Sequence, residues 1–140
     1  MGSQSVRLLL DTHIWIWLAS LDSRLNRRHQ NAIERASRRG ELYLSPISVW
    51  EIANLLRKGR MRLGKPTQAW VDEALGWPGL NLSPLTPEIA VASGELPEPF
   101  HDDPADRIIV ATARATSSRL MTADARILAY ARDGHVAVYD

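Results

Sequence analysis

Short apolar runs alternate with helix-like patterns along nearly the whole chain, and this alternation most constrains the fold. Residues 6–10 (VRLLL) are apolar enough to predict a strand covered on both faces. Further strands are predicted at residues 41–44, 80–85, 119–121 and 136–139. Helices are predicted at residues 13–20, 25–39, 46–58, 70–75, 87–93, 104–117 and 124–130. This interleaving predicts an α/β fold, a three-layer α/β/α sandwich around a mostly parallel sheet.

The length and composition predict one domain with one substantial core. The chain has 140 residues, of which 45% are hydrophobic. We expect this domain to span residues 6–140, and residues 1–5 to be disordered or left over from cloning. The chain has no cysteine, which excludes disulfides, thiolate metal sites and cysteine nucleophiles. No apolar run reaches the length of a membrane helix and no signal pattern begins the chain, so we expect a cytoplasmic protein without a membrane partner.

The basic residues are nearly all arginine, although the formal net charge is only +1. Arginine makes a two-pronged contact that suits phosphate oxygens. Six arginines crowd one segment and could line nucleic acid: Arg24, Arg27, Arg28, Arg35, Arg38 and Arg39. A solvated helix face is the favoured interpretation for most of them.

Two aspartates directly follow predicted strands. Asp11 ends the run at residues 6–10, and Asp124 follows the strand at residues 119–121 after two residues. In open parallel sheets, ligands gather in the crevice at the carboxyl ends of the strands, so both side chains should face one crevice. Alternatively, each aspartate only caps the helix that follows it. Two such acids in one small domain favour a functional site.

A second pair of aspartates begins the helix at residues 104–117. Asp103 precedes Pro104, which predicts that Asp103 caps the helix. Asp106 falls at the third helical position, where it aligns with Ile109 and Val110 inside the apolar stripe. A carboxylate on a buried helix face is unfavourable unless it is paired or bound to metal. Asp106 is therefore the stronger site candidate, and Asp103 the stronger cap.

Glu51 gives the weakest signal of the candidate acids. On its helix it lines up with Asn54 and Lys58, opposite Val49 and Ile52. A polar stripe of this kind is usually a solvated face, and only the company of the three aspartates favours a site. If Glu51 belongs to the site, Asn54 could support it from behind.

Four acids brought together in so small a domain would repel one another strongly. Two carboxylates about 4 Å apart cost on the order of 4 kcal/mol at an effective dielectric constant near 20. A divalent cation is the usual remedy, and hard cations prefer carboxylate oxygens. The four histidines show no metal-ligand spacing, and His101 is interpreted as a loop residue. The five tryptophans are interpreted as core residues or partner-facing surface.

Four segments taken together resemble the motifs of PIN-domain ribonucleases. They are LLLDTH at residues 8–13, SPISVWEI at 45–52, DPADRIIVATA at 103–113 and LMTAD at 120–124. The resemblance extends over nearly the whole chain from residue 6. It is greatest to the VapC-type toxins of bacterial type II toxin–antitoxin systems.

This resemblance implies a metal-dependent endoribonuclease that hydrolyses phosphodiester bonds in translation-related RNA. It assigns binding of Mg²⁺ or Mn²⁺ to Asp11, Glu51, Asp106 and Asp124, with Thr12 and Thr122 as hydroxyls near the site and Asp103 as a further motif residue. It also implies a homodimer and a cognate antitoxin. We expect that partner to cover the apolar surface around Trp15 and Trp17.

The alternative is a catalytically silent module that keeps the fold and binds RNA or protein. The presence of all four acids argues against it. A phosphate-accepting signalling domain would need a late lysine, and none follows Lys65. A phosphatase with a paired aspartate nucleophile would need an acid at position 13, where the chain has His13.

Overall fold

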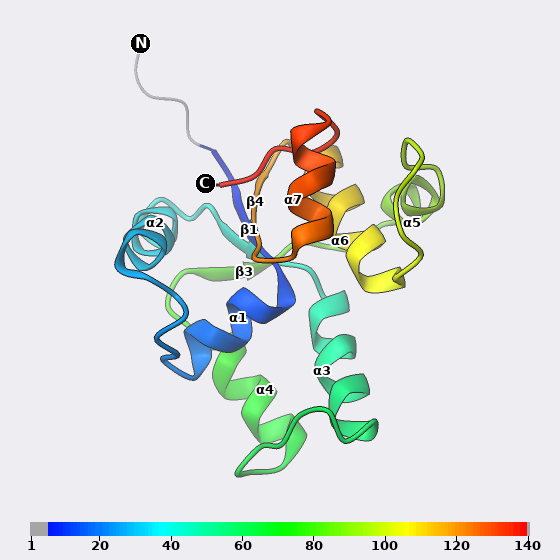
Figure 1. Ribbon diagram of the computed structural model, residues 1–140. Coiled ribbons are helices and arrows are strands. Elements are labelled where there is room, and N and C mark those ends of the chain that lie inside the picture. Colours follow the sequence, from blue (N-terminus) through cyan, green and yellow to red (C-terminus); the bar gives the residue numbers. More distant parts are fainter. Residues whose placement is uncertain (1–5, 140) are drawn as a thin grey trace.

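Four short parallel strands form the centre of the computed structural model, which describes residues 6–139 (Figure 1). They are β1 (Leu8–Leu10), β2 (Leu42–Leu44), β3 (Leu80–Leu82) and β4 (Arg119–Met121), arranged in the order β3-β2-β1-β4. Leu8 of β1 is in register with Leu42 on one side and with Arg119 on the other. The predicted parallel sheet is confirmed, and the carboxyl ends of all four strands share one edge. Residues 1–5 and Asp140 lie outside the described residues, so the predicted domain limits stay a prediction.

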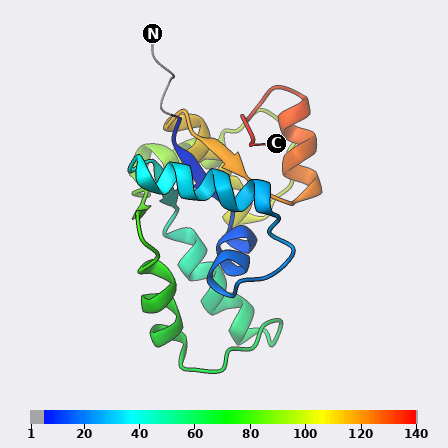
Figure 2. The ribbon, with the colours of Figure 1, turned by 90° about the vertical axis from the view of Figure 1, so that its left-hand side faces the viewer.

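Seven helices cover the two faces of this sheet within the described part of the chain. They are α1 (Thr12–Ala19), α2 (Arg27–Arg38), α3 (Ile47–Arg57), α4 (Thr67–Leu75), α5 (Pro87–Gly94), α6 (Pro104–Ala115) and α7 (Ala125–Arg132). Figure 1 shows α2 on one side of β1 and β4 and α6 and α7 on the other, and Figure 2 looks onto the sheet across α2. The predicted three-layer sandwich is confirmed. No helix between residues 6 and 139 has the length and apolar character needed to cross a membrane.

The alternating side chains of β1 divide the interior into two cores. Leu8 and Leu10 join the core under α1, α2 and α4, whereas Leu9 joins the core under α5, α6 and α7. All three leucines are buried, as expected for a strand covered on both faces. This arrangement fixes β1, and the acid that follows it, from both sides.

Helix α6 starts with the predicted side-chain cap, whereas α3 begins one residue after its predicted start. The carboxylate of Asp103 accepts a hydrogen bond from the N–H of Asp106 at 3.0 Å, with Pro104 as the first residue of α6. The predicted role of Asp103 as a cap is therefore confirmed. Helix α3 begins at Ile47, one residue later than predicted, and the Ser45 hydroxyl accepts from the N–H of Ile47 at 3.2 Å.

The predicted strand at residues 136–139 is wrong. Only Val138 bridges β4, opposite Leu120. The N–H of Leu120 donates to the Ala137 carbonyl at 2.9 Å, and the N–H of Tyr139 donates to the Leu120 carbonyl at 2.9 Å. Because the chain turns back after α7 and reaches β4 at its middle residue, pairing stops after one bridge.

The two tryptophans of α1 have different surroundings. Trp15 is completely buried, its indole N–H donates to the Ala74 carbonyl at 3.3 Å, and its ring meets Trp70 edge-on at 5.3 Å. Trp15 itself is therefore a core residue, and the expectation that a partner covers the apolar surface around it stays a prediction. Trp17 is only partly buried and remains available for contact.

We expect Leu9→Ala to lower the free energy of unfolding by about 2–5 kcal/mol. The substitution leaves a cavity in the core that the surrounding helices do not fill. Leu21→Ala is the control, since Leu21 is 83% exposed and its loss should change stability by less than about 0.5 kcal/mol. Urea unfolding of both variants measures the difference. Equal stabilities would contradict the packing described for β1.

Candidate functional site

A crevice of about 570 Å³ opens at the carboxyl ends of β1 and β4. All four predicted acids line it, each from a different part of the chain. Asp11 follows β1, Glu51 lies on α3, Asp106 lies on α6, and Asp124 follows β4. Asp103 and Asn54 line the same crevice. The structure thus brings together residues that are as many as 113 positions apart in the sequence.

Asp11 is fixed in place by hydrogen bonds to both of its carboxylate oxygens. The N–H of Thr12 donates to Oδ1 at 2.9 Å, which caps α1, and the Thr122 hydroxyl donates to Oδ2 at 2.6 Å. Burial raises the pKa of Asp11, although these hydrogen bonds oppose the rise. Asp11 therefore serves as a helix cap and also lines the crevice.

Asp124 also combines both roles. Its Oδ1 accepts from the backbone N–H groups of Arg126 and Ile127 at 2.8 and 3.1 Å, which caps α7. Burial opposes ionisation, but these hydrogen bonds and the Arg126 charge outweigh it and lower the pKa of Asp124. The Thr122 hydroxyl accepts from the N–H of Asp124 at 3.0 Å, so Thr122 links Asp124 to Asp11.

Asp106 has the most perturbed ionisation in the crevice. It lies on the buried face of α6 with Ile109 and Val110, as its helical position predicts, and is only 8% exposed. Burial is the main cause that raises its pKa to about 8, and repulsion from the neighbouring acids, Asp11 first, adds to the rise. Asp106 is therefore mostly protonated at neutral pH when no cation is present.

Glu51 is half-buried and lines the crevice together with Asn54 and Lys58 of the same polar stripe. Its Oε1 is buried and has no hydrogen-bond partner among residues 6–139. Burial, followed by repulsion from Asp11, raises the pKa of Glu51. Asn54 lines the crevice nearby, but its amide oxygen accepts from Arg57 at 2.6 Å.

Thr12 lies just behind the crevice wall. It is fully buried, and its hydroxyl lies 2.8 Å from that of Ser48 on α3, at hydrogen-bond distance. This contact ties the start of α1 to the helix that carries Glu51. Thr12 therefore helps to fix the distance between two acid-bearing elements.

His101, interpreted from the sequence as a loop residue, has its ring beside Asp106. Its Nε2 is 3.2 Å from Asp106 Oδ2, and its Nδ1 accepts from the N–H of Asp103 at 3.3 Å. A neutral ring in this position carries its proton on Nε2, facing Asp106. One ligand atom from each of His101, Asp106 and Asp124 lies within 4.8 Å of the others, close enough to share a cation.

Basic and aromatic side chains surround the acids. Arg126 approaches Asp106 and Asp124 at 3.6 and 3.5 Å, and His13, Lys58 and Arg60 also line the crevice. Trp50 lies beside Glu51 and is 49% exposed. Trp50 lies four residues before Asn54, which the sequence already placed on one face with Lys58, and this spacing could have added Trp50 to that face.

Comparisons with known proteins agree with this geometry. The PIN-domain model matches residues 8–133. Ribonuclease VapC22 of Mycobacterium tuberculosis is 33% identical over 132 residues, which cover 94% of this chain and 98% of that protein. The crystal structure of VapBC2 from Rickettsia felis bound to a promoter DNA fragment has a TM-score of 0.70 at 16% identity, covering 96% of this chain and 98% of that chain. FitAcB from Neisseria gonorrhoeae has a TM-score of 0.64 at 25% identity, covering 95% and 96%.

The chain therefore belongs to the PIN-domain family, and its resemblance to VapC-type members is confirmed.

We expect Asp106→Asn to stabilise the metal-free chain increasingly as the pH rises. Folding raises the pKa of Asp106 from 3.8 to about 8. The folded state therefore binds more protons than the unfolded state between these values. The free energy of unfolding of the native chain is consequently highest below about pH 4 and falls as the pH rises through about 8. Urea unfolding in EDTA should show the variant gaining about 1–3 kcal/mol over the native chain between about pH 5 and pH 8.5.

Asp133→Asn is the matched control, because Asp133 is exposed at the end of α7, away from the crevice. Its effect on the free energy of unfolding should change by less than about 0.5 kcal/mol over the same pH range. An equally flat response of Asp106→Asn would contradict the raised pKa.

Proposed function

We propose that this protein is a divalent-metal-dependent endoribonuclease that acts as the toxin of a toxin–antitoxin pair. The observation that carries the proposal is the convergence of Asp11, Glu51, Asp106 and Asp124 in one crevice. The relative VapC22 is a ribonuclease and matches this chain over nearly its whole length, which supports ribonuclease activity. The family resemblance supports the finer expectations of a translation-related RNA target and a homodimer.

The crevice residues fit a hard divalent cation such as Mg²⁺ or Mn²⁺. The buried Oε1 of Glu51 has no partner among the described residues, and burial, with repulsion from the neighbouring acids second, raises the pKa of Asp106 to about 8. A cation would bind the unpartnered Oε1 of Glu51 and displace the proton of Asp106. Asp11, Glu51, Asp106 and Asp124 are the proposed ligands, and the ring of His101 lies beside Asp106.

Hydrogen bonds within the chain fix the orientation of the acids to which a phosphodiester would bind through the cation. When bound, the cation would offset the charge of the phosphate and lower the pKa of a bound water. Thr12 and Thr122 hold Asp11 in one orientation through its two oxygens, and the α7 cap holds Asp124. Fixed ligands need no reorganisation during the reaction, which favours catalysis.

RNA must approach a crevice that is acidic at its centre. Lys58, Arg60 and Arg126 lie at its walls, where positive charge attracts the phosphate backbone. The half-exposed ring of Trp50 offers a surface on which a base can stack next to Glu51. These side chains support RNA, in place of a small anion, as the substrate.

Replacing Asp11 or Asp106 with asparagine is expected to abolish metal-dependent RNA cleavage, with a loss of about 100-fold or more, because each change removes a charged ligand. The fold should persist, since asparagine has nearly the same size. A cleavage assay with added Mg²⁺ or Mn²⁺, together with circular dichroism, measures both effects.

Asp133→Asn is again the control and should cleave RNA like the native chain. Full activity of either site variant would contradict the assignment. Specific RNA binding by the native chain without cleavage at any metal concentration would favour the catalytically silent module.

An apolar hollow beside α1 is the proposed docking site of the antitoxin. Its volume is about 390 Å³, and its apolar lining residues are Trp17, Leu18, Leu21, Leu25, Ile33 and Trp77. Leu21 is 83% exposed at the rim, in a left-handed backbone conformation with φ of 53°. Exposed apolar side chains around a hollow are typical of a protein interface. An apolar segment of the antitoxin would fill this space and cover Leu21.

We expect Leu21→Asp to weaken antitoxin binding by about tenfold or more, because it introduces a charge into an apolar contact. RNA cleavage by the free toxin should not change, since Leu21 lies outside the acidic crevice. Calorimetry with the co-expressed antitoxin measures affinity, and the cleavage assay measures inhibition.

Val91→Asp on α5 provides the control, because Val91 is 61% exposed and does not line the hollow. Antitoxin affinity that is equally unaffected by both changes would place the interface elsewhere.

A further inference from the structure

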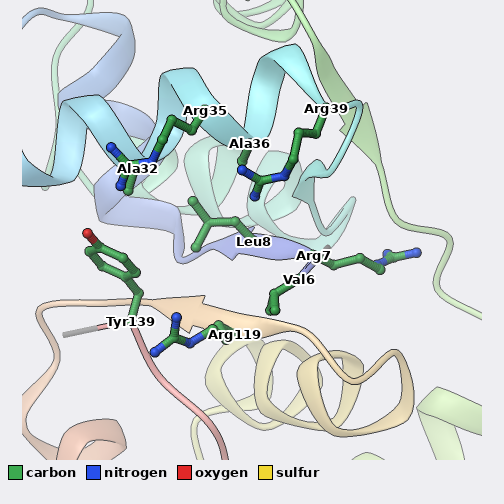
Figure 3. Close-up of a pocket in the computed structure, with 9 residues that line it drawn as sticks. All are labelled: Val6, Arg7, Leu8, Ala32, Arg35, Ala36, Arg39, Arg119 and Tyr139. Atoms are coloured by element: carbon green, nitrogen blue, oxygen red, sulfur yellow. The ribbon is translucent and has the colours of Figure 1, made fainter. Parts of the chain in front are cut away.

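A second, basic cavity lies at the opposite edge of the sheet from the acids (Figure 3). Its volume is about 240 Å³, and it lies at the amino-terminal ends of β1 and β4. Side chains of α2 and Tyr139 complete its walls. Because the strands are parallel, this edge is separate from the crevice at their carboxyl ends.

The floor of this cavity is apolar and made of small side chains. Leu8 of β1 and Ala32 and Ala36 of α2 are buried there. The two alanines lie one helical turn apart, so α2 leaves open a space that longer side chains would fill. The ring of Tyr139, which is half-buried, forms one wall.

Three guanidinium groups surround the opening. Arg35 and Arg39 lie one turn apart at the end of α2, and Arg119 faces them from the start of β4 (Figure 3). None of the three forms an ion pair with an acid among residues 6–139. No acid among these residues neutralises their charge, and Arg119 lies over the Tyr139 ring at 5.6 Å.

Among the other arginines nearby, Arg28 lies over the Tyr139 ring at 5.6 Å, and several are engaged elsewhere. Arg38 pairs with Glu34 at 3.0 Å, and Arg24 pairs with Asp22 at 2.6 Å. The side chain of Arg7 turns away from the cavity, donates to Ser83 at 3.0 Å and lies 3.5 Å above the Tyr43 ring. Within the arginine-rich segment, Arg24 and Arg38 thus form surface pairs, whereas Arg35 and Arg39 line the cavity.

We propose that this cavity binds a nucleotide, with Arg35, Arg39 and Arg119 holding its phosphate and Tyr139 packing against its base. Guanidinium groups match phosphate oxygens with paired hydrogen bonds, and a tyrosine ring stacks on any base. The cavity is a compact hollow, which suits the one phosphate and one base of a nucleotide better than an extended acidic peptide. The nucleotide can be a free mononucleotide or one unit of an RNA strand. This site does not depend on the proposed ribonuclease activity, because it lies at the other edge of the sheet.

The test is calorimetric titration of the full chain in EDTA with inorganic phosphate, adenosine 5′-monophosphate and a short single-stranded RNA. EDTA removes cations from the acidic crevice, so phosphate binding there is suppressed. We expect Arg35→Gln/Arg39→Gln, and separately Arg119→Gln, to weaken binding of the monophosphate by about tenfold or more. Tyr139→Leu should weaken the monophosphate but leave inorganic phosphate unchanged, because it removes only the stacking ring.

Arg27→Gln/Arg38→Gln is the matched control. It removes the same charge from the same helix without touching the cavity, and should bind like the native chain. Unchanged unfolding midpoints establish that the variants fold. Binding of the monophosphate without competition by RNA supports a free nucleotide, and competition by tighter-binding RNA supports an RNA strand. Absence of saturable binding of either ligand to the native chain, or an equal loss in the control, would overturn the proposal.

Discussion

Repulsion among carboxylates at the carboxyl ends of β1 and β4 is the constraint on which the rest of this structure depends. Asp11 and Asp124 follow adjacent strands, so the parallel sheet forces them to one edge. Helix α6 then adds Asp106, and α3 adds Glu51, at positions where burial already disfavours ionisation. Helix caps and the Thr122 hydroxyl offset part of the repulsion, whereas burial first and the neighbouring acids second raise the pKa of Asp106. A cation in the crevice would remove what remains.

The same parallel sheet also separates opposite charges. Its carboxyl edge gathers acids, whereas its amino edge gathers Arg35, Arg39 and Arg119 around a small apolar floor. Two independent cores hold the strands between these edges, because β1 sends Leu8 and Leu10 to one face and Leu9 to the other. The fold thus presents an acidic site and a basic site that can be altered independently.

Much of this arrangement was predictable from sequence because it follows from local periodicity. The strand–helix alternation predicted the sheet, helical spacing predicted the burial of Asp106, and Asp103-Pro104 predicted a cap. The prediction of a final strand was wrong, because the number of residues that pair with β4 depends on where the chain returns after α7. Burial of Glu51 and the position of the His101 ring depend on how α3 and a loop pack against α6, which no local pattern encodes.

The central claim is that a divalent cation replaces a proton held among these acids. Calorimetric titration of the chain with Mg²⁺ or Mn²⁺ at neutral pH, in two buffers of different ionisation enthalpy, measures this exchange directly. Because Asp106 is mostly protonated without a cation, we predict release of about one proton for each cation bound. Cation binding without proton release, or no binding at all, would contradict the account.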